Sequence, residues 1–473
     1  MKILSGVLLL IVAGALGSSY TFGVLAEKRY KEALGGLGGL GFIEVAHQRY
    51  ERGLLSSNTE TVFRIGYPEW GFDLVSTGRV VHGPFAIGDI FYGHIDPSPA
   101  LAVVTNVLRV KNFPNSSPMP QLAEWALPSA HLSARIPFGG TFRINLSMDP
   151  VSAERDGVKV DFKGATGGFL LGKGPSGATV ALASPLVAVN NPSRAFYLSG
   201  LEATLELRHG EAFPSFNLKV RAGNAGAKGG SLDFSFSDIV FTAEASGSEE
   251  MITLSQGLTI GEISAEGKRY GPATFGLVAR NIDAEALSLI AKTLSEGEVL
   301  AGTGDEKRRE ALVLKLVSLL PQIMLRSPEV EVTEVTLKTD GGAIRGWFKL
   351  FVDGSTRPSL RDLLTPSAVR AELRFSIPEE NLAEIMEAGI ISRMRLEAKE
   401  KNIPPPSEEE LGVRARRASL REIERLRKEG FLVSQDGNYY VHASFKQGRL
   451  EVNGREVKSS AALTGKNTLR SIP

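Results

Sequence analysis

The chain has 473 residues, which is enough for two or three domains of ordinary size. Lysine and arginine total 54 against 53 aspartates and glutamates, so the net charge of +1 lacks the positive excess of nucleic-acid-binding proteins. The absence of cysteine excludes disulfides, thiolate metal sites and cysteine nucleophiles. We therefore expect no nucleic-acid partner and a fold that depends on its hydrophobic core.

The chain opens with an apolar segment. No residue from Ile3 to Ala26 is charged, and a helix of this length would span about 36 Å, more than the bilayer core of about 30 Å. We interpret residues 1–26 as an uncleaved signal anchor. Its anchoring residues are Ile3, Leu8, Leu9, Leu10, Ile11, Val12, Leu16, Tyr20 and Phe22. The alternative is a secretory signal peptide that is cleaved after the small residues at 15–17.

The rest of the chain divides by composition. Residues 27–41 are a glycine-rich linker, residues 42–458 form the body and residues 459–473 form a flexible tail. A sub-boundary is expected near residues 280–305. With the signal anchor in place, the body lies outside the cytoplasm.

The body alternates apolar and polar residues with a period of two, which indicates strands with one wet face. The pattern is clear over residues 201–207, 216–220, 232–236 and 369–377. Two hairpins are indicated, one at 329–352 around Asp340-Gly341-Gly342 and one at 439–452. The predicted fold is mainly β (α+β), with a large curved, mostly antiparallel sheet after the transmembrane helix and a few helices in the C-terminal half.

Four helices are predicted in that half. One begins after the capping residue Asp283, and one begins near Pro378 and ends at Gly389. A capping box of Ser407 and Glu410 starts a charged helix that continues to about Glu429. The fourth, from about 305 to 324, carries a broad apolar stripe, which makes it the candidate wall of a hydrophobic groove. The stripe is formed by Leu312, Leu316, Leu319, Leu320, Ile323 and Met324.

Tests for catalytic chemistry are negative. No two histidines have the helical spacing of a metal pair, and three of the four adjacent-carboxylate clusters fall at predicted helix starts. The stretch from Gly167 to Lys173 fits part of a phosphate loop, but Gly174 replaces the hydroxyl residue that binds magnesium. We therefore assign no catalytic residue and no metal site, and we expect no cofactor.

Several short motifs occur in a distinctive order. They are Tyr50, Arg52, Gly53, Ser56 and Ser57, then His82, Gly83, Pro84 and Phe85, then LLPQIMLRSP at 319–328 and GRLEVNG at 448–454. Together with the apolar N-terminus, the chain resembles the YdgA-like family, which is catalogued as domain of unknown function 945. The resemblance implies a single-pass bacterial inner-membrane protein with a periplasmic body, and it brings no catalytic residue.

The motif residues also have a structural interpretation. Arg52 is expected to reach a carboxylate or stack on Tyr50, and Gly53 is expected to allow a bulge. Residues 82–85 are expected to form a turn.

Three classes of function follow from these patterns. The first is a non-enzymatic binding module that holds a lipid or another hydrophobic ligand in a groove of the sheet. The second is an envelope scaffold that acts as a homodimer or with a membrane partner. An enzyme is the third, and we expect none.

Overall fold

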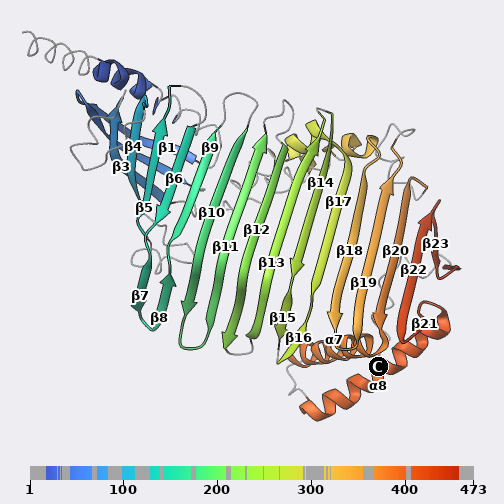
Figure 1. The fold of residues 1–473 in the computed structure, drawn as a ribbon. Helices are drawn as coiled ribbons and strands as arrows, with labels where there is room; N and C mark the ends of the chain where they lie inside the picture. The colour runs from blue at the N-terminus through green and yellow to red at the C-terminus, as the bar shows by residue number, and fades with distance from the viewer. Residues whose placement is uncertain are drawn as a thin grey trace, which may run out of the picture. The chain divides into compact units, whose positions relative to one another are not determined.

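In the computed structural model, the described part of the chain forms strands and a small number of helices (Figure 1). The structure describes residues 18–28, 30–31, 34, 43–65, 72–83, 99–111, 128–138, 142–171, 177–208, 215–229, 232–248, 250–265, 267–290, 293, 314–315, 318–319, 321–354, 367–400 and 406–457. The chain divides into two compact units. Unit 1 comprises Met1–Asp233 and Ile290–Leu316, and unit 2 comprises Phe234–Leu289 and Val317–Pro473.

The sheet of unit 1 is antiparallel throughout its described pairings. Its order is β1–β2–β3–β4–β5–β6–β9–β10–β11–β12, and the β7–β8 hairpin joins through β8 to β10. The strands are β1 Ile43–Arg52, β2 Ser56–Ile65, β3 Phe72–His82, β4 Ala102–Lys111, β5 Ala130–Ile136, β6 Phe142–Met148, β7 Val151–Arg155, β8 Val158–Phe162, β9 Ala165–Leu171, β10 Ala178–Asn190, β11 Ala195–Arg208 and β12 Ser215–Gly229.

Unit 2 contains a second antiparallel arrangement. Its order is β13–β14–β17–β18–β19–β20–β22–β23–β24, with β15 beside β13, β16 beside β15 and β21 beside β22. The strands are β13 Leu232–Gly247, β14 Met251–Ile260, β15 Glu262–Ala265, β16 Lys268–Tyr270, β17 Ala273–Asp283, β18 Glu329–Thr339, β19 Gly342–Val352, β20 Val369–Pro378, β21 Val433–Gln435, β22 Asn438–Lys446, β23 Arg449–Val452 and β24 Arg455–Val457.

Two long helices, α7 Glu379–Glu400 and α8 Glu408–Glu429, follow β20 and lie along the strand ends of unit 2 (Figure 1). The backbone N–H of Glu410 donates to Ser407 Oγ at 3.3 Å, which confirms the predicted cap of α8. Gly430 ends α8 in the left-handed conformation. Ile423 of α8 packs with Ile377 and Tyr439 in the core of this unit.

The predicted strands and hairpins are confirmed, and so is the mainly β, antiparallel class of the fold. Asp283 caps a helix as expected, because its Oδ1 accepts from the backbone N–H of Ala286 at 2.9 Å. The predicted end of a helix at Gly389 is wrong. Glycine in a helix interior is unfavourable by only about 1 kcal/mol, and α7 continues to Glu400 while packed against α8.

The N-terminal segment is helical at residues 18–28. The anchoring residues from Ile3 to Leu16 lie outside the described residues, as do the linker from 35 to 41 and the tail beyond 458. Among the helices that the structure describes, none is both long enough and apolar enough to cross a bilayer.

Candidate functional site

Along one face of the unit 1 sheet, the side chains change from buried to partly exposed. Antiparallel partners that face each other across a strand pair share a face, so the register defines rows of side chains that cross the sheet. One such row runs from β1 to β12 through Arg52, Ser57, Val80, Val104, Ala134, Ile144, Phe169, Val180, Leu205 and Leu218.

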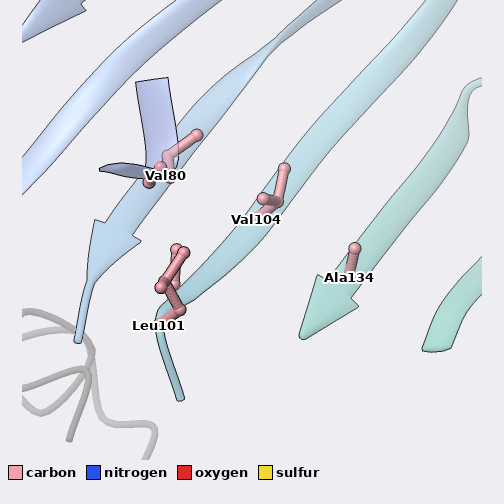
Figure 2. Close-up of a cluster of buried hydrophobic side chains, with 6 residues drawn as sticks. Val80, Leu101, Val104 and Ala134 are labelled. Carbon is pink, nitrogen blue, oxygen red and sulfur yellow. The ribbon is translucent and has the colours of Figure 1, made fainter. Parts of the chain in front are cut away.

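The N-terminal helix covers one end of this face. Ala26 of the helix packs with Val80, Val104 and Ala134, and Phe22 packs at the margin of the same cluster. Figure 2 shows Val80, Val104 and Ala134 on three neighbouring strands. Covering these residues removes them from water: Val80 is 0 % exposed and Val104 is 6 % exposed.

A polar cluster lies beneath the same helix. We call Ser57, Thr59, Ser76, His82 and Asn106 the capped polar cluster, and all five side chains are buried. Ser57 Oγ lies 2.7 Å from His82 Nε2, and Asn106 Nδ2 donates to Ser76 Oγ at 2.7 Å. These hydrogen bonds offset the unfavourable burial of polar groups.

The tautomer of His82 follows from its second contact. Nδ1 lies 3.3 Å from the carbonyl oxygen of Leu54, which can only accept, so Nδ1 carries the proton and Nε2 accepts from the Ser57 hydroxyl. Burial lowers the pKa of His82 below its usual value. A neutral histidine that accepts a hydrogen bond from a serine hydroxyl has the arrangement of a catalytic nucleophile and its general base. Here both side chains are only 1 % exposed and Gly23 of the helix lies against the ring, so the pair is closed to substrate.

The family-motif residues Tyr50 and Arg52 hold the helix at the edge of this cluster. Arg52 Nη1 lies 3.1 Å from Glu27 Oε2, which confirms the expectation that Arg52 reaches a carboxylate. Its guanidinium lies 5.2 Å from the ring centre of Tyr20, so the aromatic partner is Tyr20 where Tyr50 was the alternative expected. The Tyr50 hydroxyl is buried without a hydrogen-bond partner among the described residues, and burial raises its pKa.

The motif glycines occupy tight positions. A Cβ atom on Gly83 would lie 1.8 Å from the carbonyl oxygen of Ala100, and one on Gly53 would lie 2.5 Å from that of Ser56. Gly53 therefore forms the turn between β1 and β2, while the register shift of β1 lies between Val45 and His47, so the bulge predicted at Gly53 is wrong. Ser56 is the first residue of β2, and Pro84 and Phe85 lie outside the described residues.

Beyond the helix, the same face of unit 1 is apolar and half-exposed. None of the 14 residues of β11 is buried, and its inward and outward residues alternate from Leu201 to Arg208. We call the half-exposed apolar residues of β6 and β9–β12 the apolar face. Its members are Ile144, Leu146, Phe169, Val180, Leu182, Ala203, Leu205, Leu218 and Val220.

The opposite face of the same strands is polar. Thr179, Glu206 and Asn217 form one row there, and Thr204 pairs with Lys219 in the next. The sheet is therefore amphipathic, with a wet face and a face of half-exposed aliphatic and aromatic side chains.

A pocket of about 320 Å³ lies where β6, β9, β10 and β11 reach the β7–β8 hairpin. Its lining mixes both faces of the sheet: Met148 and Leu201 follow the rows of the apolar face, whereas Ser147, Thr166 and Glu202 belong to the opposite face. The volume lies in the range of about 300–1,000 Å³ that is common for small-molecule sites.

Unit 2 repeats the amphipathic pattern. Apolar rows cross its sheet, one of them through Leu258, Phe275, Val335, Gly346, Phe375 and Val441. Phe275 is 38 % exposed and Leu373 of the next row is 37 % exposed. On the other face Arg280 lies 2.6 Å from both Glu329 and Glu331, and the pKa of Glu331 is lowered chiefly by its hydrogen bond from Arg280.

The predicted groove helix is described only in part. Leu319, Ile323 and Met324 are half-buried, while Leu312, Leu316 and Leu320 lie outside the described residues. Its C-terminal turn is tied to the Asp283 cap, because Arg326 Nε donates to Asp283 Oδ2 at 3.1 Å.

Sequence reasoning missed much of this site. Gly23, Glu27, Thr59 and Asn106 lie in or against the capped polar cluster, and no local signal in the sequence links them. The strands of the apolar face were recognisable from their alternation, but which strands share a face depends on register.

The comparison with protein families matches nearly the whole chain. Residues 1–459 match the family described as "Bacterial protein of unknown function (DUF945)", and the chain belongs to this family. No curated protein and no solved structure matches the chain.

Proposed function

We propose that the protein is a non-enzymatic, membrane-anchored envelope protein that binds acyl chains of a lipid, or another hydrophobic ligand, on its apolar face. The observation that carries the proposal is the row that continues from the buried Val80 and Val104 into the half-exposed Phe169, Val180 and Leu205. A contiguous apolar row that stays incompletely buried is a candidate ligand or interaction surface.

The chemistry of the face favours an extended apolar ligand. Its side chains are aliphatic apart from Phe169 and the neighbouring Phe216, and the charged residues Glu202 and Glu206 point to the other face. An acyl chain needs no hydrogen bonds and gains about 0.8 kcal/mol for each methylene group that leaves water. Such a face gives little selectivity for one chain over another.

The proposed location is the bacterial inner membrane, with the body in the periplasm and residues 1–26 as the retained anchor. Support comes from the uncharged segment from Ile3 to Ala26. Phe22 and Ala26 pack on unit 1, so the bilayer-embedded part of the proposed anchor would precede them, and their contact with the sheet would tether unit 1 to the membrane.

The proposal is tested by extracting purified full-length protein with organic solvent and identifying the released lipids by mass spectrometry. We expect phospholipid in stoichiometric amount from the parent and much less from Leu205→Asn. Thr204→Asn is the matched control, because its side chain lies on the opposite face of the same strand. An extract without lipid, from a folded parent, would contradict the proposal and favour the alternative of an envelope scaffold or homodimer.

A further inference from the structure

The outward side of α8 has an unusual composition. Leu411, Ala415, Ser419 and Ile423 are the buried residues of this helix, at four-residue spacing. Residues three, four and seven apart share a helix face. On the side away from the core, between Glu410 and Glu424 of the same side, lie Val413, Arg414, Arg417, Leu420 and Arg421. We call these five residues the basic face of α8.

The charge of this segment is unbalanced. Residues 413–421 include four arginines and no acidic residue. Arg414, Arg416, Arg417 and Arg421 are exposed, and none of them meets an acidic side chain among the residues that the structure describes. By contrast, Arg425 pairs with Glu422 and Glu429, and Arg427 pairs with Glu424 at 3.2 Å.

Two aliphatic side chains lie between the unpaired arginines. Val413 is 56 % exposed and Leu420 is 54 % exposed, although both belong to a helix that is otherwise charged on its wet side. Exposed aliphatics flanked by arginines are typical of helices that lie in the headgroup region of a bilayer. The aliphatic side chains enter the interface while the long arginine stems let the guanidinium groups reach phosphates.

We propose that the basic face of α8 docks on a bilayer surface that contains anionic phospholipid. An acidic protein would satisfy the arginines but would leave no reason for Val413 and Leu420 to be exposed among them. This inference does not depend on lipid binding by the apolar face. It assigns unit 2 a membrane contact separate from the N-terminal anchor.

Because the chain has no cysteine, the full-length Val413→Cys variant can be labelled at that one position with an environment-sensitive dye. The labelled protein is mixed with vesicles of phosphatidylglycerol or of phosphatidylcholine. We expect a blue shift and a gain in emission with phosphatidylglycerol only. The control carries the same dye on Lys446→Cys, an exposed strand position of the same unit. This dye would respond if the vesicles bound there, and we expect no response.

Charge variants then test the arginines. Each arginine near an anionic surface contributes about 1 kcal/mol, so Arg414→Gln, Arg417→Gln and Arg421→Gln together should weaken the dye response on the order of 100-fold in vesicle concentration. Arg49→Gln, Arg155→Gln and Arg269→Gln together give the same loss of charge at exposed positions elsewhere and should leave the response unchanged.

Three results would overturn the proposal: no response to phosphatidylglycerol, an equal response to phosphatidylcholine, or a response to soluble polyglutamate in place of vesicles. The last would indicate an acidic protein partner. Lipid bound to the apolar face is measured separately by solvent extraction, so failure of one proposal does not imply failure of the other.

Discussion

Ser57 Oγ lies 2.7 Å from Nε2 of His82, and both side chains are buried where the N-terminal helix covers the sheet of unit 1. The contact joins β2 to β3 and places the imidazole directly under Gly23. The pair therefore connects the helix to the sheet face that becomes apolar and half-exposed further along.

Removing the Ser57 hydroxyl should leave Nε2 of His82 without a partner in a buried site. Ser57→Ala is therefore expected to lower the free energy of unfolding by about 1–3 kcal/mol, measured by urea denaturation. Ser152→Ala, at an exposed position of β7, is the control and should change it by less than about 0.5 kcal/mol. Equal effects of the two changes would show that the Ser57 contact does not stabilise the unit.

The lowered pKa of His82 has a consequence for pH dependence. In the unfolded chain the histidine titrates near 6.5, whereas the folded protein keeps it neutral to lower pH. The unfolded state therefore binds more protons below that value, and the contribution of His82 to stability is complete above pH 6.5 and is lost as pH falls through the folded pKa. Unfolding measured from pH 7.5 to 5 should show a smaller loss of stability for His82→Gln than for the parent. The same pH slope in His82→Gln as in the parent would contradict this assignment.

A side chain at position 23 should separate the helix from the sheet. The Cβ atom of Gly23→Ala would lie 2.5 Å from the His82 ring, so we expect faster amide hydrogen exchange over residues 18–28 and a loss of about 1–2 kcal/mol. Gly389→Ala in α7 is the control, because nothing lies within 4 Å of its new Cβ. That change should stabilise by up to about 1 kcal/mol through helix propensity alone. Unchanged exchange in Gly23→Ala would contradict the packing described for this helix.

The contribution of Glu331 to stability should be lost in acid. Its pKa is lowered by the hydrogen bonds from Arg280 and then Trp347, so its contribution is present above the unfolded value of 4.5 and is lost as pH falls through the folded pKa. Because the pair is partly exposed, Glu331→Gln should lower the free energy of unfolding by about 1 kcal/mol or less at pH 7, and this difference should shrink as pH falls below 4.5. A difference that stays constant into acid would contradict the role assigned to the ionised Glu331.

The alternation of residues 201–207 and 369–377 was sufficient to predict β11 and β20, because a strand with one wet face is a local pattern. The cap at Ser407 was equally local. The row from Ser57 to Leu218 could not be predicted, since it depends on the register of successive strand pairs. For the same reason the apolar face on β6 and β9–β12 was not foreseen, and the groove expected along the helix before β18 stays a prediction.

The contacts of the motif residues could not be predicted from the sequence either. Tyr50, Arg52, Ser57 and His82 were recognised as a set, but their contacts with Tyr20, Gly23 and Glu27 join segments that are 25 or more residues apart. Only the folded chain brings the N-terminal helix onto β1–β3.

The central claim is that the apolar face holds lipid, and photo-crosslinking tests it most directly. A photoreactive amino acid is placed at Leu205 or at the neighbouring Glu206 in the full-length protein, which is irradiated in membranes and analysed by mass spectrometry. The side chains at these positions lie on opposite faces of β11. We predict a phospholipid adduct at position 205 and none at position 206. No adduct at 205, or equal adducts at both positions, would contradict the claim.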